Sequence, residues 1–292
     1  MENTKLLMEN EFKVVGRLTS AEVKIGNRQS DGAGFVSVEA IVTSVIGGQT
    51  NEYQISFFAN ELTQDKKVSK LYESYAKMES LIGKKVSVTG SIRENRFWSA
   101  NQNQLVSSQQ LSGKFVKTEV ETTPDVSSFK IGGFLGSSVT ERRNKNDEVY
   151  RYDVVIGQVN YNGDNMSRFV FHINPADREV VAGVEGYSTG DTVLFQGSLN
   201  FVSETVTVSE QVGFGKPITK TYTNKQKNFY IEGGLPAIED ERAYTLEVIQ
   251  KLKAAYDAKG VEIMNAQKSV EKSAPAPVTT ATPVTKRQAA LI

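Results

Sequence analysis

Two stretches of the chain, residues 85–92 and 192–201, alternate apolar and polar positions in nearly the same way. In each stretch, apolar residues share one face of an expected β-strand with a single glycine, and the other face is mostly polar. The two glycines, Gly90 and Gly197, occupy the same place in the pattern. A glycine inside a strand marks a bend or a close backbone approach, and small barrels need such bends at their corners. The pattern therefore predicts barrel-forming strands in both stretches.

The sequence around these strands is repeated as well. Residues 12–18 (FKVVGRL) and 129–135 (FKIGGFL) open the two copies with Phe-Lys-aliphatic-x-Gly-x-Leu. Each copy continues through a polar turn, a β-rich run and an aromatic strand, then a helical or irregular connection at 60–81 or 175–187. The glycine-containing strand and a final strand pair follow. The matching order predicts two similar domains rather than a solenoid.

The repeat sets the expected domain boundaries. We expect a first domain at residues 11–120 and a second at 129–234. The polar segment between them, residues 121–128, contains Pro124 and reads as a short linker, because proline and clustered polar residues interrupt regular structure.

The composition changes after residue 234. Apolar residues at helical spacing predict a C-terminal helix within residues 235–269, with Gly260 as a helix-ending residue. Residues 270–292 are of low complexity and are expected to be disordered. They end in a short apolar tip, AALI.

About five strands per domain, with a helix-like insertion between the third and fourth, is the order of elements in the OB-fold. The chain resembles the tandem OB-fold single-stranded DNA-binding proteins of bacteriophages and is distantly similar to bacterial SSB. The resemblance covers residues 11–234 and rests on element order and the internal repeat. It implies a mainly β fold of two tandem OB-fold-like five-stranded barrels, followed by a C-terminal helix and a disordered tail. It also implies a setting in phage DNA replication or recombination.

The composition excludes several kinds of site. The chain has no cysteine and one histidine, which excludes disulfides, thiolate zinc sites and multi-histidine metal sites. We expect no cofactor. No early segment reads as a signal peptide and no apolar run is long enough to span a bilayer, so we expect a cytoplasmic protein, in the bacterial host if it is phage-encoded. The formal net charge is zero, so a basic binding surface has to be local.

No convincing catalytic constellation is present, and we expect no enzyme. The segment 213–219 (GFGKPIT) lacks the spacing of a phosphate-binding loop. The acidic residues at 239–241 fall in the expected first turn of the C-terminal helix, where they favourably meet the helix dipole.

Lysines and aromatic residues alternate in the expected last hairpin of the second domain. Residues 211–231 contain four lysines and no acidic residue. Lysines neutralise phosphates and aromatic rings stack on bases, so this hairpin is a candidate binding loop. The alternative is a solvated hairpin whose lysines protect an exposed edge. The candidates here are Lys216, Lys220, Tyr222, Lys225, Lys227 and Tyr230.

The comparable hairpin of the first domain carries arginines beside the single tryptophan. Its candidates are Arg93, Arg96, Phe97 and Trp98. The competing interpretation is a tryptophan folded back over the end of the barrel.

The loops between the first and second strands of each domain are also charged, and the β-strands beside them contain further candidates. Phe35 alternates with Val36 and Val38 and should therefore point outward. His172 should lie on the face opposite the core, at the place that Phe58 occupies in the first copy. Each could equally be an ordinary surface residue. The candidates of this group are Lys24, Arg28, Phe35, Phe58, Arg142, Arg143, Lys145, Arg151 and His172.

The sequence favours a non-catalytic protein that coats single-stranded DNA, and two alternatives remain open. One is a structural or interaction protein, such as a virion component built from tandem β-barrels. The other is an accessory domain of a nucleic-acid enzyme, which would need a catalytic domain that we do not find in this sequence. Replication or recombination proteins are possible partners of the tail, but Lys286 and Arg287 stand where the bacterial SSB tail is acidic. The preference for DNA or RNA and the oligomeric state stay open.

Overall fold

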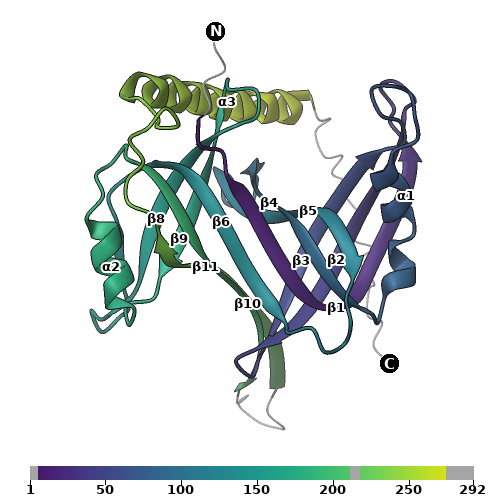
Figure 1. Ribbon diagram of the computed structural model, residues 1–292, viewed down its shortest axis with the longest axis horizontal. Coiled ribbons are helices and arrows are strands. Elements are labelled where there is room, and N and C mark those ends of the chain that lie inside the picture. The colour runs from purple at the N-terminus through teal and green to yellow at the C-terminus, as the bar shows by residue number, and fades with distance from the viewer. Residues whose placement is uncertain (1–5, 211–217, 274–292) are drawn as a thin grey trace, which may run out of the picture.

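The computed structural model describes residues 6–210 and 218–273, and Figure 1 shows two β-barrels side by side. Their strands form one sheet of eleven strands within the described residues. Residues 270–273 of the expected disordered tail belong to the C-terminal helix, so that part of the prediction is wrong, and residues 274–292 lie outside the described residues.

The first barrel is a closed ring of five strands. It comprises β1 (Asn10–Asn27), β2 (Gly34–Ile46), β3 (Gln49–Asn60), β4 (Lys85–Ser99) and β5 (Gln104–Thr118). Strand β1 pairs with both β2 and β4, β2 pairs with β3, and β4 pairs with β5, all antiparallel. A short parallel pairing of β3 with β5 closes the ring. This strand order is that of an OB-fold barrel.

The second barrel repeats the order. It comprises β6 (Val126–Leu135), β8 (Val149–Val159), β9 (Met166–Ile173), β10 (Thr192–Glu210) and β11 (Ile218–Gly234), and β7 (Thr140–Arg143) adds a short strand beside β8. Strand β6 pairs with β8 and β10, and a parallel contact between β9 and β11 closes the ring. The predicted fold of two OB-fold-like five-stranded barrels is confirmed.

Helices fill the same place in each copy, between the third and fourth barrel strands. In the first barrel these are α1 (Lys70–Ala76) and the 3₁₀ turn η1 (Met78–Leu81), which bury Tyr75 and Met78 against the core. The second barrel has α2 (Arg178–Glu185), which buries Val184.

The two barrels are joined by direct strand pairing of β1 with β6. In this antiparallel pair, Phe12 lies opposite Phe129, and these are the first residues of the repeated heptapeptide. Equivalent residues that face each other across an antiparallel pair are related by a local two-fold axis, so the barrels have approximate two-fold symmetry. Residues 126–128, which were expected to belong to the linker, form the beginning of β6.

Each barrel also receives the long hairpin of the other. Strand β10 packs against β3: the Tyr53 hydroxyl donates to the carbonyl of Leu199 at 3.0 Å, and the backbone N–H of Phe201 donates to Asn51 Oδ1 at 2.9 Å. The Tyr53 and Phe201 rings lie 5.4 Å apart.

The reciprocal contact is made by the β4–β5 hairpin on β9. Glu94 Oε2 accepts from the backbone N–H of Arg168 at 2.8 Å, and Gln109 Oε1 accepts from that of Val170 at 2.7 Å. Strand β9 has only a short pairing with β11, so these side chains satisfy N–H groups that the barrel ladder leaves free.

Helix α3 (Leu246–Ser273) begins later than predicted and continues through Gly260, so the expected start and end are wrong. The helix starts late because Tyr244 is held in the core, where its hydroxyl accepts from the backbone N–H of Val159 and donates to the carbonyl of Leu7. The hydroxyl of the next residue, Thr245, caps the helix by accepting from the backbone N–H of Val248. Gly260 does not end the helix. It is buried, and a β-carbon there would meet the guanidinium of Arg96.

The strand glycines behave as predicted. The β4–β5 ladder shifts register at Gly90 and the β10–β11 ladder shifts at Gly197. A β-carbon at either glycine would clash with backbone of the neighbouring strand, at Ser112 or Tyr230. Both glycines therefore permit a bulge that bends the barrel.

We expect Gly197→Ala to lower the free energy of unfolding by about 1–3 kcal/mol, because the backbone of Tyr230 has to move to admit the methyl group. The matched control is Gly183→Ala in α2, where nothing lies within 4 Å of the added carbon. That variant should be unchanged or more stable by about 0.5–1 kcal/mol. Urea unfolding measures both, and equal stability of the two variants would contradict the bulge's role.

Candidate nucleic-acid interface

Two phenylalanines, one half-buried and one exposed, stack on the outer face of the first barrel. Phe35 on β2 and Phe58 on β3 have ring centroids 5.8 Å apart and an interplanar angle of 23°. Val36 and Val38 point into the core, so Phe35 lies on the outer face as the alternation predicts. Phe58 is 54% exposed. Phe35 is half-buried, so the exposed ring of Phe58 provides most of the stacking surface for another flat group.

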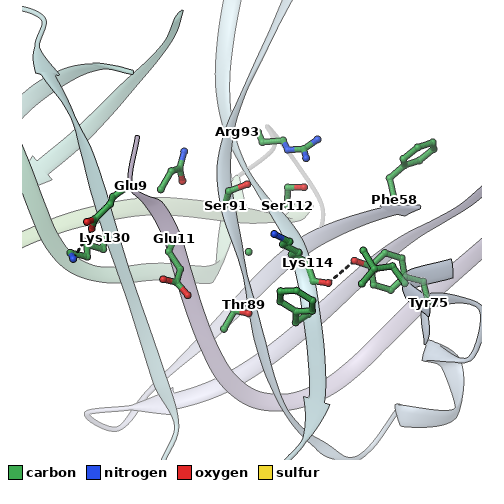
Figure 2. Close-up of a pocket in the computed structure, with 15 residues that line it drawn as sticks. Glu9, Glu11, Phe58, Tyr75, Thr89, Ser91, Arg93, Ser112, Lys114 and Lys130 are labelled. Carbon is green, nitrogen blue, oxygen red and sulfur yellow. Dashed lines mark hydrogen bonds and ion pairs between the residues drawn. The ribbon is translucent and has the colours of Figure 1, made fainter. Parts of the chain in front are cut away.

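A large pocket lies beside this stack (Figure 2). It has a volume of about 840 Å³ and is lined by strands of the first barrel and by the joined strands β1 and β6. Figure 2 shows Phe58 and Tyr75 at one end, Glu9 and Lys130 at the other, and Arg93 between them. The Tyr75 hydroxyl donates to the carbonyl of Lys114 at 2.7 Å, and burial raises its pKa to about 12, so it remains a donor.

The cations of the pocket differ in their pairing. Lys130 forms an ion pair with Glu9 at 2.6 Å. Arg93 and Lys114 have no carboxylate partner within the described part of the chain. Lys114 instead lies over the ring of Phe115 at 5.3 Å, and Phe115 is 56% exposed. Unpaired cations next to exposed rings are suited to a ligand that carries both anionic and aromatic groups.

The pocket continues across the barrel junction. A second pocket of about 410 Å³ shares Glu11 and Lys130 with the first and extends over β6 and β10 to Gln196 and Glu232. Carboxylates therefore line this part of the depression together with lysines.

In the other direction, the outer face of the first barrel leads to the hairpin of the second. Gln54 and Ser56, which precede Phe58 on the outer side of β3, line a pocket of about 160 Å³ together with Phe201 and Lys227. Partial burial and the neighbouring Lys225 lower the pKa of Lys227, and Glu39 offsets part of this. The structure thus brings three predicted groups to one surface: the phenylalanine pair, Arg93, and Lys225 with Lys227.

The outer face of the second barrel carries a charged cluster. The buried carboxylate of Asp153 accepts from Arg142 Nε at 2.6 Å, and its other oxygen lies 3.0 Å from Arg151 Nε and 3.0 Å from His172 Nδ1. Tyr230 lies beside His172, with ring centroids 6.3 Å apart. His172 is on the face opposite the core, as predicted, but it is 8% exposed and is not a free surface residue.

The strand register also corrects the predicted match between the two copies. Arg17 and Phe134 occupy equivalent positions in the two copies, so their partners Thr43 and Gly157 are equivalent as well. Following the β2–β3 and β8–β9 ladders from these partners matches His172 to Ser56 rather than to Phe58. The sequence comparison of the aromatic strands was therefore wrong by two residues.

Burial and charge set the protonation of this cluster. Burial alone would raise the pKa of Asp153, but Arg142, Arg151 and His172 hold it below its ordinary value. Burial and the charge of Arg151 lower the pKa of His172, so its imidazole is neutral near pH 7. The cluster then holds two guanidinium groups and one carboxylate.

Arg96 serves the assembly of the fold instead of facing solvent. Its guanidinium lies 3.8 Å from the ring centroid of Tyr256 on α3 and donates to the carbonyl of Tyr256 at 2.6 Å. The Tyr256 hydroxyl donates to Glu94 Oε1 at 2.5 Å. Of its predicted neighbours, Phe97 is 43% exposed and Trp98 is half-buried within β4.

Three of the cations predicted in loops differ from Arg93 and Lys114, because each forms an ion pair with a carboxylate. Lys24 pairs with Glu22 at 2.9 Å, Arg28 with Asp31 at 2.9 Å, and Arg143 with Glu141 at 2.6 Å. Lys145 is exposed. Lys216 lies outside the described residues, and Lys220 and Tyr222 are described only as backbone positions of β11.

Sequence reasoning missed Lys114, Phe115 and Lys130. The segment 114–117 (KFVK) shows the same alternation of basic and aromatic residues that identified the last hairpin, and this signal could have found the first two. Within the described residues there is no group of three side chains able to hold a metal ion. None of the described helices is long and apolar enough to cross a membrane.

A family model described as YorF matches residues 9–269, and the chain belongs to this family. No curated protein sequence matches the chain. Among solved structures, the chain is similar to the single-stranded DNA-binding protein from Thermus aquaticus. A deletion mutant of that protein is 14% identical, with 82% of this chain and 97% of the other covered and a TM-score of 0.48. The wild-type protein is 12% identical, with 79% and 94% covered and a TM-score of 0.48.

We expect the free energy of unfolding to fall as the pH is lowered below about 6.5, because unfolded chains protonate histidine at its ordinary pKa while the buried His172 resists protonation. The slope for one proton is at most about 1.4 kcal/mol per pH unit. Asp153, whose pKa is lowered, adds a further loss only below about pH 4. Urea unfolding from pH 7.5 to 4.5 tests this, and His172→Asn should remove the decline between pH 6.5 and 5. A decline of the same size in the variant would show that another group causes it.

Proposed function

We propose that this protein binds single-stranded DNA without catalysis and coats it during replication or recombination. The observation that carries the proposal is the partly exposed Phe35–Phe58 stack beside the unpaired cations Arg93 and Lys114. Stacking of a base on an aromatic side chain contributes about 1–3 kcal/mol and depends little on which base it is. The nearby cations are placed to neutralise backbone phosphates.

The arrangement of the surface supports a strand rather than a single nucleotide. Outward positions lead from the large pocket over Phe58, Ser56 and Gln54 to Lys227, which belongs to the other barrel. A strand laid along them would contact both barrels. Because β1–β6 pairing holds the barrels together, little interdomain freedom would be lost on binding.

The finer setting rests on the resemblance of the element order to phage proteins. We place the protein in phage DNA replication or recombination, in the cytoplasm of the bacterial host. Single-stranded DNA is its proposed partner.

A second candidate is a structural or interaction protein, favoured by one observation. Glu11 and Glu232 line the depression across the barrel junction, where a polyanion would be repelled. A protein partner could use that region through its own lysines and arginines.

Binding to labelled oligo-dT, followed by fluorescence anisotropy at two salt concentrations beside a matched duplex, tests the proposal. We expect preference for the single strand and weaker binding at the higher salt. Phe35→Ala with Phe58→Ala should weaken binding by about 10–100-fold, through loss of stacking. The control is Tyr161→Ala, which removes a ring that is 93% exposed in the β8–β9 turn.

Absence of binding at low salt would refute the proposal and favour the interaction protein. Binding that the phenylalanine substitutions leave unchanged would place the strand on another surface.

A further inference from the structure

The equivalent outer faces of the two barrels carry different kinds of side chain, aromatic rings on the first and arginines on the second. The strands β2 and β3 of the first barrel correspond to β8 and β9 of the second, and each pair has one outward side. The equivalent positions are held by Glu39 and Ser56 in the first barrel and by Asp153 and His172 in the second. Beside them, the first barrel carries the stacked rings of Phe35 and Phe58, and the second carries Arg142 and Arg151.

The arginine pair is fixed in place by a single carboxylate. Asp153 is buried, with 4% exposure. Arg142 Nε donates a hydrogen bond to it at 2.6 Å, and the buried Nε of Arg151 lies 3.0 Å from its other oxygen as an ion pair without a hydrogen bond. Contact through Nε leaves the terminal nitrogens of each guanidinium available. These nitrogens have no hydrogen-bond or ion-pair partner within the residues that the structure describes, although the Arg151 guanidinium lies 5.5 Å from the ring centroid of Tyr150.

The charge of the cluster is not balanced internally. Two guanidinium groups face one carboxylate, and the neutral His172 adds no charge, which leaves one net positive charge. The side chains of Arg142 and Arg151 are 52% and 31% exposed, so this charge is accessible from solvent. Guanidinium groups that are already oriented lose little entropy when they take up a phosphate, and their planar geometry matches two of its oxygens.

We propose that Arg142 and Arg151 bind a backbone phosphate of the same single strand whose bases stack on Phe35 and Phe58. The inference rests on the proposed function and divides it between the barrels: the first barrel binds bases and the second binds the sugar–phosphate chain. Asp153 is a positioning residue that orients the two arginines.

The test compares two probes on the full-length chain. One is oligo-dT, and the other is an abasic oligonucleotide of equal length that carries phosphates without bases. Arg142→Gln with Arg151→Gln should reduce affinity for both probes by similar factors. It should also reduce the slope of log K against log salt by about 0.7, the contribution of one phosphate neutralised on a single strand. Phe35→Ala with Phe58→Ala should weaken only the binding of oligo-dT and leave the slope unchanged.

The matched control removes two cations elsewhere. Arg17→Gln with Lys117→Gln deletes charges that pair with Glu121 and Glu119, and should leave the slope unchanged. If the double arginine variant does not fold, the single variant Arg142→Gln keeps Arg151 and His172 on Asp153 and should weaken binding of both probes, with a fall in slope smaller than the ~0.7 of a whole phosphate.

The outcomes separate this inference from the proposed function. Failure of the natural chain to bind oligo-dT overturns both. Binding with a slope that the arginine variants do not change overturns the division between barrels and leaves single-strand binding in place. Loss of oligo-dT binding without loss of abasic binding in those variants also overturns it.

Discussion

The antiparallel pairing of β1 with β6 is the contact on which the rest of the structure depends. It places Phe12 opposite Phe129, so the two copies of the repeat meet at equivalent residues. A contact of this kind is self-complementary, as in the two-fold interfaces of homodimers, but here both halves belong to one chain. Because the pairing continues the sheet from one barrel into the other, the relative position of the barrels is fixed by backbone hydrogen bonds instead of by a flexible linker.

The approximate symmetry explains why the long hairpins serve the opposite barrel. Strand β10 reaches β3, and the β4–β5 hairpin reaches β9, where Glu94 and Gln109 satisfy backbone N–H groups. The exchange has different results on the two sides. It takes Arg96 into a contact with α3, and it brings Lys227 to the outer face of the first barrel. The candidate surface is therefore composite, and neither barrel would reproduce it alone.

Local patterns predicted the strands, the two barrels and the bends at Gly90 and Gly197, because alternation and glycine placement act within a single strand pair. They failed where distant segments meet. Gly260 looks like a helix end until Arg96, on the distant strand β4, is known to pack against it. His172 looks like a surface residue until Asp153 and Tyr230 surround it. The two-residue error in matching Phe58 to His172 arose because strand register is set by pairing, which the aromatic residues do not reveal.

A chain of zero net charge can still present a cationic surface if its carboxylates are paired elsewhere. Near the junction of the barrels, Lys85 pairs with Asp125, Arg17 with Glu121, and Lys117 with Glu119. These ion pairs hold the linker and its neighbours, and they neutralise acidic groups away from the phenylalanine stack. Arg93 and Lys114 are left beside the exposed rings with no carboxylate partner in the described chain. In the proposed function, this surface would select unpaired bases, because the bases of a duplex are already stacked on one another and could not reach Phe35 or Phe58.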